Sequence, residues 1–196
     1  MFKNYAMTFT QACNNYVQKQ YKQADIIVEY GSGGSTLLGA KLGKYVVSVE
    51  SSSSWLLGVL GAAVEQNLPG KIIPIWTDIG VTKEWGFPVD DSNWKNWSNY
   101  PRLPWQYCKQ HNLSPDVVLI DGRFRLACFL SACVSVTKET LILFDDYEDR
   151  KYYHIAEQLF PKIEVIDNRM AVFKVVPNKV SSQFLLDHLH LFSDAR

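Results

Sequence analysis

A short glycine-rich segment is the first candidate site in this chain. Residues 28–36 read Val-Glu-Tyr-Gly-Ser-Gly-Gly-Ser-Thr, and they follow a run of β-branched residues and precede a helical pattern. At such a junction, glycine lets backbone N–H groups face a ligand without obstruction by side chains. We therefore expect Gly31, Ser32 and Gly33 to cradle a nucleotide-like ligand, although a tight turn with no ligand is the alternative.

The residue two places before the first glycine suggests which ligand this is. The carboxylate of Glu29 would repel a pyrophosphate, but it complements a ligand that carries an ammonium and a sulfonium group. A nicotinamide-dinucleotide fingerprint would instead place glycine or alanine where this chain has Thr36. We expect Glu29 to contact the positively charged end of the ligand.

Acidic and aromatic residues follow the next two predicted strands. Glu50 stands where dinucleotide-type folds place an acid that accepts hydrogen bonds from ribose hydroxyls, and capping of the next helix is the alternative role. Asp78 follows the third predicted strand and is a candidate for contact with an adenine ring. Trp85 is a candidate for stacking on that ring or for contacting the substrate.

Three aspartates follow two predicted central strands. Asp121 lies in Ile-Asp-Gly-Arg, whereas Asp145 and Asp146 lie in Phe-Asp-Asp-Tyr. Strand ends of this kind form the ligand crevice of open α/β sheets, so Asp121 and Asp145 are candidate catalytic residues, and Asp121 also a candidate cofactor contact. The alternatives are helix capping for Asp145 and Asp146 and an ion pair for Asp121.

Two arginines beside Asp121 suggest a second kind of contact. The guanidinium groups of Arg123 and Arg125 match a carboxylate or phosphate in bidentate fashion, so both are candidates for holding an anionic substrate. A solvated helix start is an equally good interpretation of this pair.

The pattern of the chain predicts the frame that holds these residues. Short apolar runs alternate with amphipathic stretches, which is typical of a parallel sheet covered by helices on both faces. A helix is expected within residues 1–22, and others over 35–42, 55–64, 124–136 and 148–160. Strands are expected over 24–30, 45–50, 71–76, 116–120, 140–144, 163–167 and 170–176. The last two strands are joined so closely that they must form an antiparallel hairpin. The prediction is thus a doubly wound α/β fold with a seven-stranded, mostly parallel sheet.

Composition limits the possible partners and compartment. The 196 residues suit one domain, and 20 basic residues balance 20 acidic ones, so a nucleic-acid partner is not expected. The sequence shows no signal peptide and no apolar run of membrane-spanning length, which predicts a cytoplasmic protein. Residues 79–105 are rich in tryptophan and proline without a clear period, so we expect a lid over a site.

From Ala24 to Val176, the glycine motif, the order of elements and the terminal hairpin resemble the class I S-adenosylmethionine-dependent methyltransferases. The Ile-Asp-Gly and Asp-Asp-Tyr motifs are similar to those of the small-molecule O-methyltransferases. The resemblance implies S-adenosylmethionine as cofactor, with Gly31, Ser32 and Gly33 around its methionine part. In metal-dependent members, Asp121, Asp145 and Asp146 would hold a divalent cation. In those members, asparagine often stands at the position of Asp146. This difference, together with the nearby Arg123, argues against a metal ion in this chain.

The leading functional hypothesis is methyl transfer to an oxygen or nitrogen of a small molecule. A cofactor-binding or structural protein on the same fold, without catalysis, is the second hypothesis, and a nicotinamide-dependent oxidoreductase is the third. The apolar spacing of residues 184–192 suggests either closure of the core or contact with a second subunit, so a homodimer is a further expectation.

Overall fold

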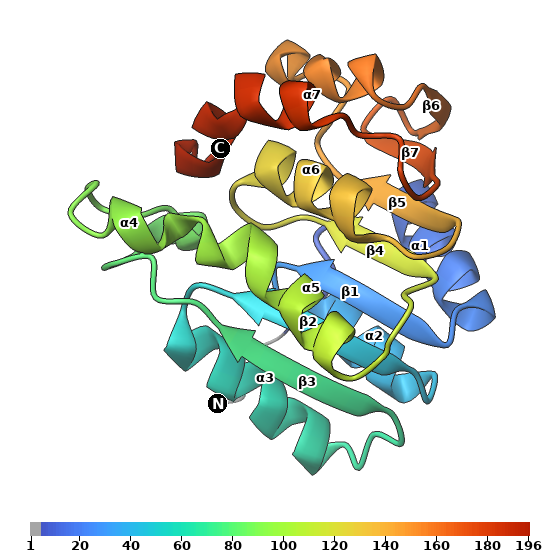
Figure 1. Cartoon of the computed structure of the whole chain (residues 1–196). Helices are drawn as coiled ribbons and strands as arrows, with labels where there is room; N and C mark the ends of the chain where they lie inside the picture. Colours follow the sequence, from blue (N-terminus) through green and yellow to red (C-terminus); the bar gives the residue numbers. More distant parts are fainter. Residues whose placement is uncertain (1–4) are drawn as a thin grey trace.

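The computed structural model describes residues 5–196 and contains one seven-stranded sheet in the order β3-β2-β1-β4-β5-β7-β6 (Figure 1). The strands β1 to β5 are mutually parallel where they pair, whereas β7 runs antiparallel to both β5 and β6. Their bounds are β1 Ile26–Tyr30, β2 Tyr45–Glu50, β3 Lys71–Trp76, β4 Val117–Ile120, β5 Thr140–Phe144, β6 Lys162–Ile166 and β7 Met170–Val175. The predicted fold class is confirmed.

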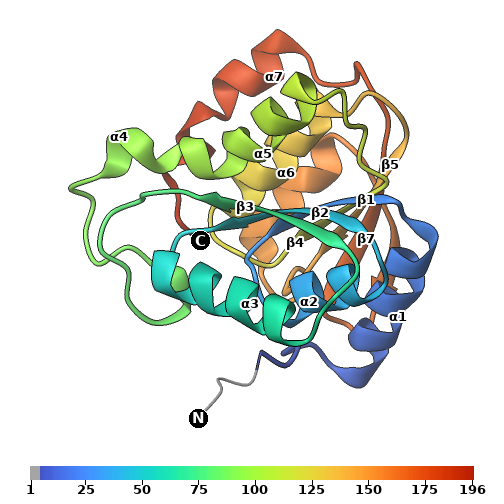
Figure 2. The same ribbon diagram turned by 90° about the horizontal axis from the view of Figure 1, so that it is seen from below.

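Helices cover both faces of the sheet (Figure 2). One layer holds α1 Gln11–Gln23, α2 Gly34–Lys41 and α3 Ser53–Glu65, and the other holds α5 Asn99–Gln110, α6 Arg125–Ser135 and α7 Ser182–Asp187. All four residues of β4 are buried, because a central parallel strand is covered on both faces. The shorter elements are η1 Glu84–Gly86, α4 Trp94–Trp97, η2 Lys151–Gln158 and η3 Leu189–Ser193.

The first helix begins later than the sequence predicts. The side chain of Thr10 accepts a hydrogen bond from the N–H of Cys13 and so caps α1, which starts at Gln11. Residues 5–10 precede the helix, and the rest of the expected helix, residues 1–4, lies outside the described residues. Phe9 packs in a core cluster with residues of α1, and residues 6–9 line a cavity described below.

The tryptophan-rich segment is more regular than expected. Residues 94–97 and 99–110 are helical, and Pro104 lies inside α5. The hydroxyl of Tyr30 donates to the carbonyl of Pro101 (2.6 Å) and accepts from the indole N–H of Trp105 (2.8 Å). This buried anchor to β1 holds the helix despite its prolines, so the irregular part is confined to about residues 77–93.

Two C-terminal connections also differ in detail. Residues 151–158 form 3₁₀ turns where an α-helix was predicted. The hairpin turns at Asp167 and Asn168, which both have positive φ, and Arg169 donates its N–H to the carbonyl of Ile166 (3.0 Å). Positive φ at both central residues is the type I′ geometry that matches the twist of a hairpin. The turn places Arg169 beside the end of β5.

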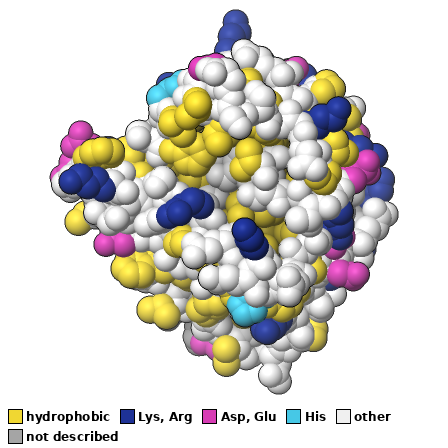
Figure 3. Space-filling view, viewed as in Figure 1, with side chains coloured by type: hydrophobic (Ala, Val, Ile, Leu, Met, Phe, Trp, Pro, Cys, Tyr) yellow, Lys and Arg dark blue, Asp and Glu magenta, His cyan; other side chains and the backbone are white. Residues whose placement is uncertain are grey.

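On the face shown in Figure 3, basic and acidic side chains are scattered, and no continuous basic stripe is visible.

The C-terminal residues Phe184, Leu185 and Phe192 pack against the core on the α6 side. Among residues 5–196, no helix combines the length and apolar character needed to cross a bilayer.

Candidate functional site

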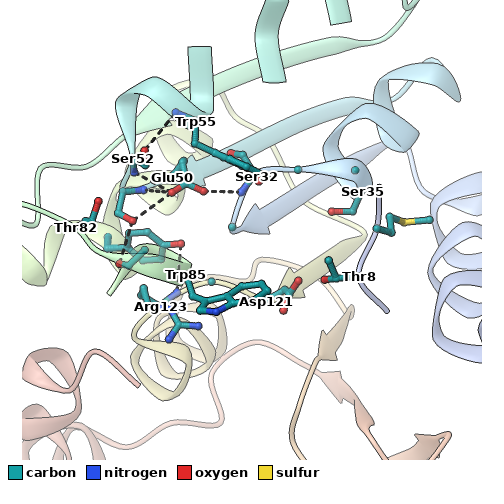
Figure 4. A pocket seen from close by; sticks show the side chains of 18 of the residues that line it. Thr8, Ser32, Ser35, Glu50, Ser52, Trp55, Thr82, Trp85, Asp121 and Arg123 are labelled. Atoms are coloured by element: carbon teal, nitrogen blue, oxygen red, sulfur yellow. Dashed lines mark hydrogen bonds between the residues drawn. The ribbon is translucent and has the colours of Figure 1, made fainter. Parts of the chain in front are cut away.

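A cavity of about 600 Å³ opens at the carboxyl ends of β1, β2 and β4 (Figure 4). Its volume lies within the range of about 300–1,000 Å³ that is typical of small-molecule sites. Glu50, Ser32 and Trp55 line one side, and Trp85, Asp121 and Arg123 line the opposite side. The sheet edge expected to hold the ligand therefore holds the large cavity.

The glycine turn forms part of the cavity wall. Gly31 has φ of 96°, and a Cβ atom there would lie 3.1 Å from the backbone of Asp121, so both the conformation and the space favour glycine. A Cβ atom at Gly33 would meet no atom within 4 Å. Gly31, Ser32 and Gly33 all line the cavity, as the sequence predicted.

Gly122 allows the turn after β4 to approach the turn after β1. A Cβ atom on Gly122 would lie 2.1 Å from the Tyr100 hydroxyl oxygen and 2.9 Å from the nitrogen of Gly31. Gly122→Ala is therefore expected to lower the free energy of unfolding by about 1–3 kcal/mol, because the two turns must separate. Urea denaturation measures this loss. Gly61→Ala in α3 is the control, because a Cβ atom there meets nothing within 4 Å, and unchanged stability in Gly122→Ala would contradict the packing argument.

Glu50 is held in place by backbone N–H groups. Its carboxylate accepts from Ser51 (2.8 Å), Ser52 (2.9 Å) and Ser32 (3.2 Å). Burial raises the pKa of Glu50, and these hydrogen bonds oppose the rise. The residue is buried yet lines the cavity, so its oxygens can also accept hydrogen bonds from a ligand.

The cavity includes contacts that sequence reasoning missed. Trp55 was assigned only to the apolar face of a helix, but its indole N–H donates to the carbonyl of Ser32 (2.7 Å) and its side chain lines the cavity. Residues 6–9, which precede α1, line it as well. Ser51 and Ser52, between β2 and α3, also line it. No signal in the sequence links residues 6–9 to a strand end far along the chain.

Glu29 does not reach the cavity, and this prediction is wrong in its geometry. Its carboxylate is fully buried and accepts from the hydroxyls of Tyr21 (2.6 Å) and Thr36 (2.6 Å). Side chains alternate along a strand, and Tyr30 faces α5, so Glu29 faces the α1 and α2 layer. Burial raises its pKa, and the hydroxyl donors oppose the rise. The carboxylate therefore does not line the cavity, where direct contact with a cationic ligand was expected.

Glu29 instead stabilises the glycine turn through the side chains that it contacts. The Thr36 hydroxyl that donates to Glu29 also accepts from the N–H of Gly33 (2.9 Å). Ser48, which contacts Glu29 at 3.4 Å, lies 2.7 Å from the Ser32 hydroxyl. The carboxylate thus fixes the side chains that shape the turn.

The segment after β3 brings one predicted residue to the cavity and leaves the other outside. Trp85 lines the cavity but remains 77% exposed, and it has φ of 61°. Asp78 is exposed and accepts from the N–H of Gly80 (3.0 Å), and it does not line the cavity. A Cβ atom on Gly86 would lie 2.9 Å from the Ser51 hydroxyl and 4.0 Å from the Glu50 carboxylate. Trp85 and Gly86, both from the segment expected to form a lid, thus line the cavity.

The three aspartates lie together, but they differ in access to the cavity. One oxygen from each of Asp121, Asp145 and Asp146 falls within 4.8 Å of the others. Asp121 lines the cavity, and burial raises the pKa of its carboxyl, an effect that Arg125 opposes and the other two aspartates increase. Asp145 is fully buried and does not line the cavity, so the structure does not support a catalytic role for it.

The aspartate cluster is already neutralised by arginines. Arg169 holds Asp145 through two hydrogen bonds of 2.9 and 2.7 Å and lies 3.0 Å from Asp146. Arg125 lies 3.3 Å from Asp121 and 3.4 Å from Asp146. A divalent cation at these oxygens would sit against guanidinium groups and suffer their repulsion. The residues present do not fit a metal ion.

The two candidate substrate-binding arginines have different roles. Arg125 donates to the carbonyls of Gly122 (2.9 Å) and Asp145 (2.7 Å) and does not line the cavity. The side chain of Arg123 lines the cavity, and its guanidinium stacks on the ring of Phe87 at 3.9 Å. Arg125 is therefore structural, and Arg123 remains a binding candidate.

Comparison with known proteins identifies the family. The chain matches no protein-family model and no curated protein. Among solved structures, it is 35% identical to a methyltransferase-like protein from Silicibacter pomeroyi, over 97% of this chain and 98% of that chain, with a TM-score of 0.89. An O-methyltransferase from Bacillus cereus in complex with SAH is 16% identical, over 89% of this chain and 84% of that chain, with a TM-score of 0.59.

A further O-methyltransferase, from Streptomyces achromogenes and in complex with SAM, is 11% identical with a TM-score of 0.60, over 87% of this chain and 82% of that chain. These two distant matches show the shared fold, whereas the match at 35% identity shows the family. The chain belongs to the same family as the methyltransferase-like protein, and it shares the fold of the O-methyltransferases that were solved with SAH and SAM.

Proposed function

We propose that the cavity binds S-adenosylmethionine and that the protein transfers its methyl group to an oxygen or nitrogen of a small molecule. The observation that carries this proposal is the position of Glu50. Its carboxylate lies at the end of β2, is fixed by three backbone N–H groups, and faces the cavity opposite Asp121. An acid in this position accepts hydrogen bonds from ribose hydroxyls in related α/β folds.

Different residues of the cavity would bind the parts of the cofactor and exclude water. The backbone at Gly31 and Gly33 leaves room for the methionine part of the cofactor, and Glu50 would hold the ribose. When bound, the cofactor supplies a methyl group on a sulfonium sulfur, and transfer from it requires mainly alignment and exclusion of water. Trp85 and Gly86 line the cavity, and their segment would exclude water from the bound ligand.

Asp121 is the cavity carboxylate that can receive a proton from the acceptor. Its raised pKa brings a carboxyl closer to the range in which a base works near neutral pH. Arg125 holds the carboxylate from the side away from the cavity, which keeps its position fixed.

Glu50→Gln tests the cofactor site. We expect the dissociation constant for S-adenosylhomocysteine to rise by about 10–100-fold, because a charge-assisted hydrogen bond contributes roughly 1.5–3 kcal/mol. Isothermal titration calorimetry measures the change. Asp78→Asn is the matched control, since it removes a carboxylate that lies outside the cavity. Wild-type protein that fails to bind S-adenosylhomocysteine would refute the proposed function.

Removal of metal ions tests the reaction. We expect transfer of a labelled methyl group from S-adenosylmethionine to a small-molecule fraction of an extract to be unchanged by EDTA, because arginines neutralise the aspartates. Scintillation counting follows the label. Loss of activity with EDTA that Mg²⁺ restores would overturn this account of the cluster. Transfer to no acceptor would instead favour a binding protein without catalysis.

A further inference from the structure

We propose that Arg123 binds an anionic group, a carboxylate or a phosphate, on the methyl acceptor. This inference rests on the proposed function, because it assumes that the cofactor occupies the side of the cavity near Glu50. It adds the chemical class of the second substrate.

The first observation is that Arg123 is a buried cation without a carboxylate partner. The residue is only 6% exposed, and it forms no ion pair with any acidic residue in the described part of the chain. Its Nε atom is buried with no hydrogen-bond partner. Buried charged groups are usually paired, because burial removes their hydration.

The second observation is the contrast with its neighbour in the chain. Arg125 satisfies its guanidinium with two backbone carbonyls and the carboxylates of the aspartate cluster. Burial lowers the pKa of Arg123, and the charge of Arg125 lowers it further. A bound anion would oppose both effects, and a guanidinium offers two parallel N–H donors to a carboxylate or phosphate.

The third observation is that the surroundings of Arg123 hold it at the cavity. Phe87 supports one face of the guanidinium at 3.9 Å, and Trp85, two residues before Phe87, lines the same cavity. Lys83, from the same segment, also lines the cavity and supplies a second positive charge. The segment that would cover the bound substrate thus carries both an aromatic support and a cation.

The acidic residues of the cavity already have partners within the chain. Asp121 is paired with Arg125 at 3.3 Å, and Glu50 is occupied by backbone N–H groups. Both carboxylates therefore have their own donors, whereas the Nε–H of Arg123 has no acceptor among the described residues. A carboxylate of the cofactor itself is the competing source of an anion, and the experiment must separate the two.

The test measures the binding of three ligands to the full chain. S-adenosylhomocysteine and methylthioadenosine, which lacks the amino-acid part, are titrated calorimetrically into wild type and Arg123→Met. Inorganic phosphate is then titrated into protein saturated with S-adenosylhomocysteine. Arg102→Met is the matched control, because Arg102 is exposed on α5 and bonded to Asn99. Arg123→Lys retains the charge if the loss of the guanidinium disturbs the fold.

We expect phosphate to bind the wild-type complex and Arg102→Met equally. Binding to Arg123→Met should be weaker by about tenfold or more, with partial recovery in Arg123→Lys. Affinity for S-adenosylhomocysteine should be unchanged in all variants. Equal phosphate affinity in Arg123→Met, or no phosphate binding by the wild type, overturns the proposal.

Competition between phosphate and S-adenosylhomocysteine also overturns it. The proposal is also overturned if Arg123→Met loses affinity for S-adenosylhomocysteine but keeps it for methylthioadenosine. Either result would assign the guanidinium to the carboxylate of the cofactor. Failure of the wild type to bind either nucleoside would refute the proposed function, and the phosphate titration without cofactor would still report on Arg123.

Discussion

Gly33→Leu is expected to abolish measurable binding of S-adenosylhomocysteine while leaving the fold intact. A side chain at this position meets no protein atom within 4 Å, so it would project into the cavity and occupy the space of the ligand. The φ of Gly33 is 175°, an extended value that other residues adopt. We expect affinity to fall by about 100-fold or more, because overlap of this size costs several kcal/mol. Calorimetric titration measures it.

The control for this variant is Gly61→Leu on α3, a second glycine at which a Cβ atom meets nothing within 4 Å, but away from the cavity. It should bind S-adenosylhomocysteine as the wild type does. Urea denaturation of both variants separates lost binding from lost folding. A Gly33→Leu protein that binds with unchanged affinity would place the cofactor elsewhere.

Asp145→Ala is expected to lower the free energy of unfolding by about 3–5 kcal/mol, because it removes a buried carboxylate that Arg169 holds through two hydrogen bonds and leaves Asp146 as the only carboxylate partner of that guanidinium among the described residues. Asp145 is fully buried and held by Arg169 at 2.7 and 2.9 Å. Urea denaturation followed by far-ultraviolet circular dichroism measures the loss.

A surface ion pair provides the comparison. Lys174 and Glu139 lie 3.1 Å apart with both side chains about half exposed, and exposed pairs contribute only about 0–1 kcal/mol. Glu139→Ala should therefore be close to wild type in stability. If Asp145→Ala were equally mild, the aspartate cluster would not depend on its arginines, and the argument against a metal ion would lose its basis.

The order of the strands along the chain was predictable, because apolar runs of four to six residues alternate with helical patterns. The error in α5 has a clear cause. Pro101 and Pro104 lower the helical propensity, and the helix is fixed by Tyr30, which lies about 70 residues earlier and whose hydroxyl contacts both ends of Pro101–Trp105. Local patterns do not report such a contact.

The site was predictable in part for the same reason. Gly31, Ser32, Gly33, Glu50 and Asp121 follow strands that are neighbours in the sheet, and all of them line the cavity. Glu29, Asp145 and Arg125 also lie near strand ends, but which layer each side chain enters depends on packing against α1, α2 and the hairpin. Sequence spacing alone gives the strand end and not the side chain's surroundings.

The extended residues before α1 have a practical consequence for handling the protein. Ala6, Met7, Thr8 and Phe9 form part of the cavity wall, and Gly34 packs so closely on this segment that a Cβ atom would lie 2.4 Å from the carbonyl of Tyr5. An affinity tag or fusion partner joined just ahead of this segment is thus attached close to the cavity wall. Purification handles are better placed elsewhere or cleaved before any affinity is measured.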